Sequence, residues 1–314
     1  MNRKRFLRNS VAAGLGTGLV GCSPFKMLSS DDDISRLTIL HTNDTHARIE
    51  PFSENAPEYA GMGGVARRAT MIKRIRSENP HTLLLDAGDV FQGTPYFNEY
   101  HGALDYEVMS KMGYDASTIG NHEFDNGVQG FCDVADKANF PFLSSNYNFG
   151  STDMGYHVRE FMTKKVGDVK VGIFGLGVDF QNLVLDHLHK GISYISPVAI
   201  SRKMVMVLKY YHHCDMVICL SHLGYDYADN RVSDRVLARE VDGIDLIIGG
   251  HTHTFLDQPE VFQKSNGKQT LVSQVGFAGI MLGRIDYEFN ERNEVAGVMA
   301  MNEAVIGSGS QGIG

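Results

Sequence analysis

The chain has 314 residues, 43% of them hydrophobic, so it can bury a large core and does not have the composition of a disordered protein. Its 37 acidic residues outnumber its 29 basic residues, giving a formal net charge of −8. This balance argues against binding of a nucleic-acid polymer. A phosphate anion would have to be attracted locally, by bound cations or a small basic pocket.

The first residues have the pattern of an export signal. A basic stretch, RKRFLR over residues 3–8, precedes an apolar run over 11–21 that is too short to span a bilayer. The run ends in LVGC, which resembles the lipobox of a bacterial lipoprotein. We therefore predict a signal peptide over 1–21 and a protein exported to the periplasmic side of a membrane, anchored by lipid on Cys22. A plain secretory signal is the alternative.

The basic stretch also resembles a twin-arginine signal, although Lys4 stands where a second consecutive arginine is usual. Residues 22–35 are rich in Ser and Asp and lack periodicity, which predicts a tether. We expect one folded domain over 36–305 and a flexible Gly/Ser tail over 306–314. The later cysteines form no C-x-x-C pair, so neither a disulfide framework nor a cysteine metal site is expected.

Short apolar runs alternate with helical patterns along the rest of the chain. The runs predict strands at 37–40, 82–85, 216–220 and 244–248. Apolar residues at helical spacing predict helices at 65–76, 103–112, 128–138 and 199–212. Two later strands joined by turns are expected at 270–275 and 283–289. The alternation predicts an α/β domain that also contains some antiparallel sheet.

Five loops along the chain carry side chains of the kind that bind metals. They read HTNDTH (41–46), DAGD (86–89), GNHEFD (120–125), SHLG (221–224) and GGHTH (249–253). Loops after the carboxyl ends of strands converge on one rim of an open α/β sheet. Among their side chains are the four imidazoles, two carboxylates and one amide that suit two first-row divalent ions sharing a carboxylate.

These motifs resemble those of the calcineurin-like metallophosphoesterases, specifically their 5'-nucleotidase branch, over residues 37–289. The resemblance implies a four-layer sandwich of two mixed β-sheets flanked by helices. It also implies metal-activated hydroxide attack on phosphate monoesters, with nucleotides as the expected substrates and nucleotide catabolism as the expected role. The two divalent ions would be Zn, Mn, Fe or Co.

The resemblance also implies a role for each residue of the site. Asp44, His46 and His253 would bind one ion, Asn121, His222 and His251 the other, and Asp89 would bridge both, with His122 and Asp125 as the catalytic pair. Other interpretations stay open at this point. Asn121 could be a turn residue, and Asp125 could cap a helix. We expect His41 and Asp86 to be structural.

Two other functions stay open as well. A sulfur-ester hydrolase of the thiosulfate-oxidation type uses a related domain, and a binding lipoprotein could keep the fold without catalysis. Members of the family commonly carry a second, C-terminal domain that holds the nucleobase. The chain has only about 25 residues after its last predicted strand, at 283–289. We therefore expect either broad specificity or a separate polypeptide that supplies this recognition.

Overall fold

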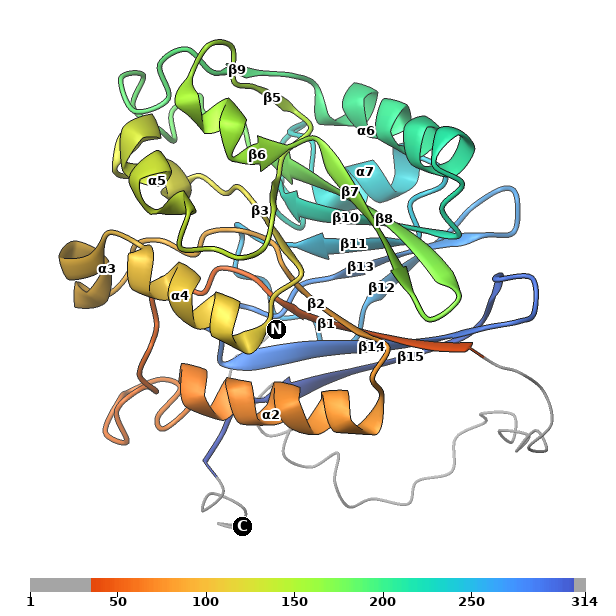
Figure 1. The fold of residues 1–314 in the computed structure, drawn as a ribbon, viewed down its shortest axis with the longest axis horizontal. Helices are drawn as coiled ribbons and strands as arrows, with labels where there is room; N and C mark the ends of the chain where they lie inside the picture. Colours follow the sequence, from red (N-terminus) through yellow and green to blue (C-terminus); the bar gives the residue numbers. More distant parts are fainter. Residues whose placement is uncertain (1–34, 308–314) are drawn as a thin grey trace.

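The computed structural model of the chain describes residues 35–307. Two mixed β-sheets lie face to face in it, and helices cover their outer faces (Figure 1), which confirms the predicted α/β class and layering. The predicted signal peptide over 1–21 and the lipidation site Cys22 lie outside the described residues. So do nearly all of the tether over 22–35 and most of the tail over 306–314.

The first sheet has seven strands, in the order β15-β14-β1-β2-β3-β4-β6. Strands β1, β2, β3, β4 and β6 run parallel to one another. β14 pairs antiparallel with β1, and β15 pairs antiparallel with β14. The strands are β1 (Ser35–Thr42), β2 (Thr82–Asp86), β3 (Ala116–Thr118), β4 (Phe142–Leu143), β6 (Val158–Arg159), β14 (Met281–Phe289) and β15 (Val295–Ala304).

The second sheet has six strands, in the order β12-β13-β11-β10-β8-β7, with four parallel strands between two antiparallel edges. Its strands are β7 (Phe161–Val166), β8 (Val169–Gly177), β10 (Met216–His222), β11 (Leu246–Gly249), β12 (Glu260–Gln263) and β13 (Gln269–Ser273). A small separate ladder pairs β5 (Tyr147–Asn148) with β9 (Ser193–Tyr194).

Helices α2 and α4 lie against the first sheet, and α6 and α7 lie against the second (Figure 1). The helices are α2 (Val65–Glu78), α3 (Pro95–Tyr100), α4 (Ala103–Met112), α5 (Gly127–Ala135), α6 (Pro197–Met206) and α7 (Asp234–Glu240). Short helical turns lie at η1 (His122–Phe124), η2 (Asp153–Tyr156) and η3 (Val207–Tyr211). Within residues 35–307, no helix is both long and apolar enough to cross a membrane.

Both faces of the central strands are buried, which explains why their sequences are apolar runs rather than alternating patterns. Ile39 and Leu83 point into the layer between the two sheets, where they join Ile173 and Ile218 in one fully buried cluster. Leu84, next along β2, points the other way and packs beneath the helices of the first sheet. The inter-sheet layer therefore fixes how the two sheets face each other.

Some element boundaries were wrong. The predicted strand at 244–248 begins only at Leu246, and the predicted helix at 128–138 ends at Ala135. The strand predicted at 283–289 is not the last, because β15 (Val295–Ala304) follows it. Sequence patterns missed β15 because it is an edge strand with exposed side chains such as Met299, and its pairing with β14 is a long-range backbone interaction.

Strand β8 was also not predicted, since three glycines interrupt its apolar run. A Cβ atom at Gly175 would lie 2.1 Å from the backbone oxygen of Leu143, and one at Gly177 would lie 2.3 Å from the ring of Tyr147. The glycines therefore permit close packing of β8 against the segment that contains Leu143 and Tyr147. The cysteines of the described region, Cys132, Cys214 and Cys219, are free thiols.

Truncation of the inter-sheet layer should destabilise the whole domain. Ile39→Ala removes a side chain with 0% exposure and leaves a cavity between the sheets. We expect it to lower the free energy of unfolding by about 2–5 kcal/mol, measured by urea denaturation. Met299→Ala, at a side chain that is 60% exposed, is the control and should change it by less than about 0.5 kcal/mol. Equal losses of unfolding free energy in the two variants would contradict the burial of Ile39 between the sheets.

Candidate metal centre

Polar side chains gather where parallel strands of both sheets end. Three of the loops follow β1, β2 and β3 of the first sheet, and two follow β10 and β11 of the second. The side chains they bring to this rim are Asp44, Asp89, Asn121, His222, His251 and His253, together with His46. The packing of the two sheets therefore joins residues separated by about two hundred positions in the chain.

One group, called site 1, consists of Asp44, His46 and His253. Their ligand atoms all lie within 4.8 Å of one another. Nε2 of His253 is 3.0 Å from Nε2 of His46 and 3.3 Å from Oδ1 of Asp44. One carboxylate oxygen and two imidazole nitrogens thus point at a common volume, which is a donor set typical of a divalent metal site.

The second group, called site 2, consists of Asp89, His222 and His251, whose ligand atoms also lie within 4.8 Å of one another. Nε2 of His222 is 2.9 Å from Oδ2 of Asp89, although the two atoms are not in hydrogen-bond geometry. Asn121 is buried in the loop that contacts Asp89, and its Oδ1 has no hydrogen-bond partner. This buried oxygen is therefore free to accept a ligand.

The imidazoles are oriented by backbone carbonyl groups. Nδ1 of His222 donates to the oxygen of Ala87 across 2.7 Å, and Nδ1 of His46 donates to the oxygen of Phe91 across 3.0 Å. When Nδ1 carries the proton, the lone pair of Nε2 is free to bind a metal ion. The ring orientations at both sites therefore fit divalent metals.

The protonation preferences of the individual imidazoles differ. Burial lowers the pKa of His46, and burial together with the charge of His222 lowers the pKa of His251 to about 4, so both rings present neutral nitrogens at pH 7. Burial alone would raise the pKa of Asp89, but His222 outweighs this effect and the pKa is lowered. Reciprocally, Asp89 overcomes the effect of burial on His222 and raises its pKa. This pair concentrates charge inside the protein.

The backbone of the centre is unusual. Left-handed φ angles between 49° and 70° occur at five of the seven candidate ligands, namely Asp44, His46, Asp89, His251 and His253. Residues with a Cβ atom seldom adopt this region, and the conformation persists only where the surroundings enforce it. Strained backbone is common at functional sites, because it aims side chains that regular structure would point elsewhere.

The catalytic pair predicted from the sequence lies beside the two sites. Nδ1 of His122 donates to Oδ2 of Asp125 across 2.9 Å, so Asp125 pairs with His122. Partial burial would lower the pKa of His122, but this hydrogen bond and the charge of Asp89 outweigh it and raise the pKa to about 9. His122 also lines a pocket of about 240 Å³ together with His46 and His253. A ligand that enters this pocket, called the metal pocket, meets site 1 and His122 together.

Sequence reasoning missed the residues that hold the ligand loops in shape. The buried carboxylate of Glu123 accepts hydrogen bonds from the backbone N–H groups of Gly120, Asp89 and Val90, at 2.6, 3.1 and 2.8 Å. It therefore ties the loop after β2 to the loop after β3. The signal was present in GNHEFD, between His122 and Asp125, but the spacing alone assigns no role to this carboxylate.

Two further supports come from Asn43 and Gln274. Nδ2 of Asn43 donates to Oδ2 of Asp44 across 2.6 Å, and its Oδ1 accepts from the backbone of Val275 across 3.0 Å. The side-chain amide of Gln274 donates to the backbone oxygen of Gly250. Asn43 thereby joins the end of β1 to the end of β13, and Gln274 joins the end of β13 to the end of β11. No motif in the sequence marks Gln274, since its role arises from tertiary contact.

His41 and Asp86, which the sequence predicts to be structural, hydrogen-bond to neighbouring strands. Nε2 of His41 is 3.0 Å from Oγ of Ser273, which joins β1 to β13 across the sandwich, and burial lowers the pKa of His41 to about 3. Asp86 accepts from Thr42 and Ser117 within the first sheet, and burial raises its pKa to about 6.

The chain is similar to known proteins in both sequence and structure. The snake venom 5'-nucleotidase of Gloydius brevicauda is 37% identical over 280 residues, which cover 82% of this chain but 46% of that protein. The chain thus spans about half the length of the curated relative. The structure of a 5'-nucleotidase precursor from Thermus thermophilus is 32% identical, with a TM-score of 0.76 over 86% of this chain and 54% of that chain.

A sulfate thiohydrolase, SoxB, from Thermus thermophilus also superposes, with a TM-score of 0.69 over 86% of this chain and 57% of that chain. At 19% identity this likeness shows the fold alone. The family model described as calcineurin-like phosphoesterase matches residues 37–255, which is more than half of the chain and contains the five ligand loops. The chain therefore belongs to the calcineurin-like phosphoesterases, a family of phosphoester hydrolases that use divalent metals.

Proposed function

We propose that this chain hydrolyses phosphate monoesters, with nucleotides as its substrates, and that site 1 and site 2 each hold a divalent metal ion. The observation that carries the proposal is the convergence of two complete sets of ligand atoms, each within 4.8 Å, on one rim of the fold. When bound, two such ions would activate a water molecule as the nucleophile and offset the negative charge of the phosphoryl group.

Within this proposal the ligand roles follow the positions of the side chains. Asp44, His46 and His253 would hold the ion of site 1, and Asp89, His222 and His251 would hold the ion of site 2. Asn121 would add its unpartnered Oδ1 to site 2, and Asp89 would be the carboxylate shared by both ions. Asp89 is held in place for this role, since its backbone N–H donates to Glu123 and its Oδ1 accepts from the backbone N–H of His122. The donor set suits Zn, Mn, Fe or Co.

His122 and Asp125 act on the leaving group in this proposal. Because Nδ1 of His122 is engaged by Asp125, its Nε2 is the nitrogen available to donate a proton to the departing ester oxygen. General acid catalysis of this kind contributes about 10²–10⁴-fold to a rate. Asp125 orients the ring and stabilises its protonated form.

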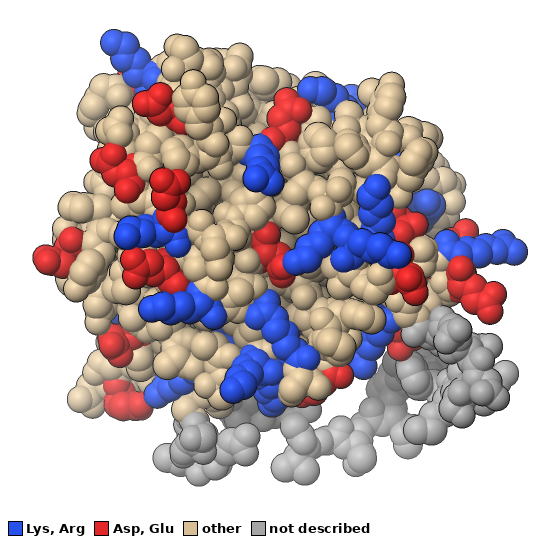
Figure 2. All heavy atoms as spheres, in the orientation of Figure 1, with Lys and Arg blue, Asp and Glu red and all other residues tan. Residues whose placement is uncertain are grey.

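The comparisons favour phosphate esters over sulfur esters. Relatives above 30% identity are named as nucleotidases, whereas the sulfate thiohydrolase shares only the fold with this chain. A nucleic-acid polymer is not proposed as a partner, because the chain is acidic overall. On the face drawn in Figure 2, acidic side chains lie interspersed with the basic ones.

We also propose the chain organisation predicted from the sequence. Residues 1–21 would be removed as a signal peptide, Cys22 would carry the lipid, and 22–35 would tether the domain over 36–305, with 306–314 as a flexible tail. The active domain would then lie on the periplasmic side of the membrane. A separate substrate-recognition polypeptide would add base specificity beyond what this chain supplies.

Removal of a shared ligand and removal of a catalyst should have different signatures. Asp89→Ala is expected to empty or disorder both metal positions, because one carboxylate serves both ions. His122→Ala should keep both metals and lose about 10²–10⁴-fold in kcat. Elemental analysis paired with kinetics separates the two results. His213→Ala, at an exposed histidine, is the control and should change neither quantity. Loss of metal in His122→Ala equal to that in Asp89→Ala would refute this division.

Discrimination for the base should be modest in this polypeptide. Apart from histidines, Phe277 is the one aromatic side chain among the described residues that line the metal pocket, and its ring already stacks on His253 at 15°. We expect a nucleoside monophosphate to be preferred over ribose 5-phosphate by less than about 100-fold in kcat/KM, or about 2.7 kcal/mol. The two share a leaving alkoxide, and an aryl phosphate serves as a further comparator. A larger ratio would show that the chain reads the base strongly.

The anchor is tested separately from catalysis. Cys22→Ser should move the protein from the membrane fraction to the soluble fraction after ultracentrifugation, with unchanged kcat/KM, because the tether separates the anchor from the domain. Cys132→Ser provides the matched cysteine control and should stay with the membranes. Membrane association that survives Cys22→Ser would eliminate the lipid anchor at this residue.

A further inference from the structure

A second pocket adjoins the metal pocket. It has a volume of about 480 Å³ and is called the tyrosine pocket, defined by Arg48, Glu50, Tyr96, Glu99 and Tyr100. Arg48 lines both pockets. The chain also passes directly from one to the other, since residues 92–93 line the metal pocket and residues 94–96 line the tyrosine pocket. A ligand that extends out of the metal pocket along this wall reaches the tyrosine pocket.

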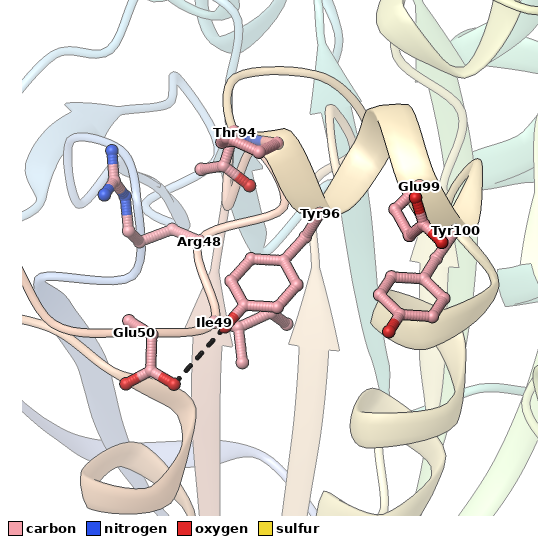
Figure 3. Close-up of a pocket in the computed structure, with 8 residues that line it drawn as sticks. Arg48, Ile49, Glu50, Thr94, Tyr96, Glu99 and Tyr100 are labelled. Atoms are coloured by element: carbon pink, nitrogen blue, oxygen red, sulfur yellow. Dashed lines mark hydrogen bonds between the residues drawn. The ribbon is translucent and has the colours of Figure 1, made fainter.

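The tyrosine pocket offers flat aromatic surfaces. The rings of Tyr96 and Tyr100 lie 21° from parallel with centroids 6.4 Å apart, both on helix α3. Tyr100 is 47% exposed, so its ring is accessible to a ligand. Figure 3 shows Tyr96 between Arg48 and Glu50 on one side and Glu99 and Tyr100 on the other. The volume lies within the range of about 300–1,000 Å³ found for small-molecule sites.

The charges of the tyrosine pocket select the end of a substrate that can enter it. Glu50 accepts a hydrogen bond from the hydroxyl of Tyr96 at 3.4 Å, and Glu99 is exposed at the rim. Ionised carboxylates only accept hydrogen bonds, so they favour hydroxyl and amino groups and repel phosphate. The phosphoryl end of a substrate is therefore directed to the metal pocket. An uncharged end rich in hydrogen-bond donors is directed to the tyrosine pocket.

Arg48 stands at the junction with unused hydrogen-bonding capacity. Its guanidinium carbon lies 4.3 Å from the ring centroid of Phe52, and its Nε is buried without a hydrogen-bond partner. Among residues 35–307, no carboxylate forms an ion pair with it. A buried donor without a partner is costly, and an acceptor atom on a ligand that spans both pockets would satisfy it.

We propose that the tyrosine pocket binds the nucleoside part of the substrate, an inference that rests on the proposed phosphatase function. The base packs against the rings of Tyr96 and Tyr100, and the hydroxyl or amino groups of the nucleoside donate to Glu50 and Glu99. Arg48 contacts the substrate where it passes between the pockets. This subsite supplies the modest preference for nucleotides that the metal pocket cannot supply by itself.

The test compares AMP with ribose 5-phosphate in Tyr100→Ala and in Tyr96→Leu. Both variants should lower the ratio of kcat/KM for AMP over ribose 5-phosphate by at least about fivefold, since each removes an aromatic ring on which the base stacks. The value for ribose 5-phosphate itself should stay within about twofold. Tyr210→Ala, at a tyrosine 73% exposed on another surface, is the matched control and should leave the ratio unchanged.

Binding of adenosine separates this inference from the proposed function. Saturation-transfer NMR with adenosine on the metal-loaded protein should detect binding that Tyr100→Ala abolishes, whether or not the protein hydrolyses either phosphate. Absent hydrolysis with Tyr100-dependent adenosine binding would overturn the phosphatase proposal and support the subsite. An unchanged substrate ratio, or adenosine binding insensitive to both variants, would overturn the subsite. A Tyr100-dependent preference for phosphocholine over AMP would overturn it in favour of a cationic leaving group.

Discussion

Two carboxylates held almost entirely out of water are the constraint on which the rest of this structure depends. Asp44 is 0% and Asp89 2% exposed, and a buried charge is tolerated only where compensating groups surround it. The backbone of His251 donates to Asp44, the backbone of His122 donates to Asp89, and His222 approaches Asp89 closely. These contacts need left-handed turns in the ligand loops, and the apolar layer between the sheets holds the loops in that strained conformation.

The support for these loops is shared between the two sheets. Glu123 ties together two loops of the first sheet, Asn43 joins a loop of the first sheet to one of the second, and Gln274 joins two loops of the second sheet. A small change in the packing of one sheet against the other would therefore move both metal sites. This dependence explains why residues without any ligand role are buried and hydrogen-bonded around the centre.

In our proposal, the metal pocket and the tyrosine pocket divide the recognition of a substrate into two chemically different tasks. Imidazoles and carboxylates form the part that suits cations and, through them, phosphate. Aromatic rings and exposed carboxylates form the adjoining part, which suits a neutral partner with hydrogen-bond donors. Arg48 stands between them with an unpartnered nitrogen. Such a division lets an acidic protein attract a phosphate ester locally, despite a net charge that repels it at long range.

The sequence by itself determined the α/β class, strands β1, β2, β10 and β11 and the five ligand loops, because these buried parallel strands are apolar runs and metal-binding residues follow them directly. It did not determine β8, β15 or the roles of Glu123 and Gln274. Glycines disguised β8, exposed side chains disguised β15, and the two polar residues act through partners distant in the chain or through backbone groups. The grouping of these His and Asp residues into two sites came from the family resemblance. Only the tertiary structure decided how they approach one another, since that depends on how two sheets pack and on left-handed backbone that local sequence preferences disfavour.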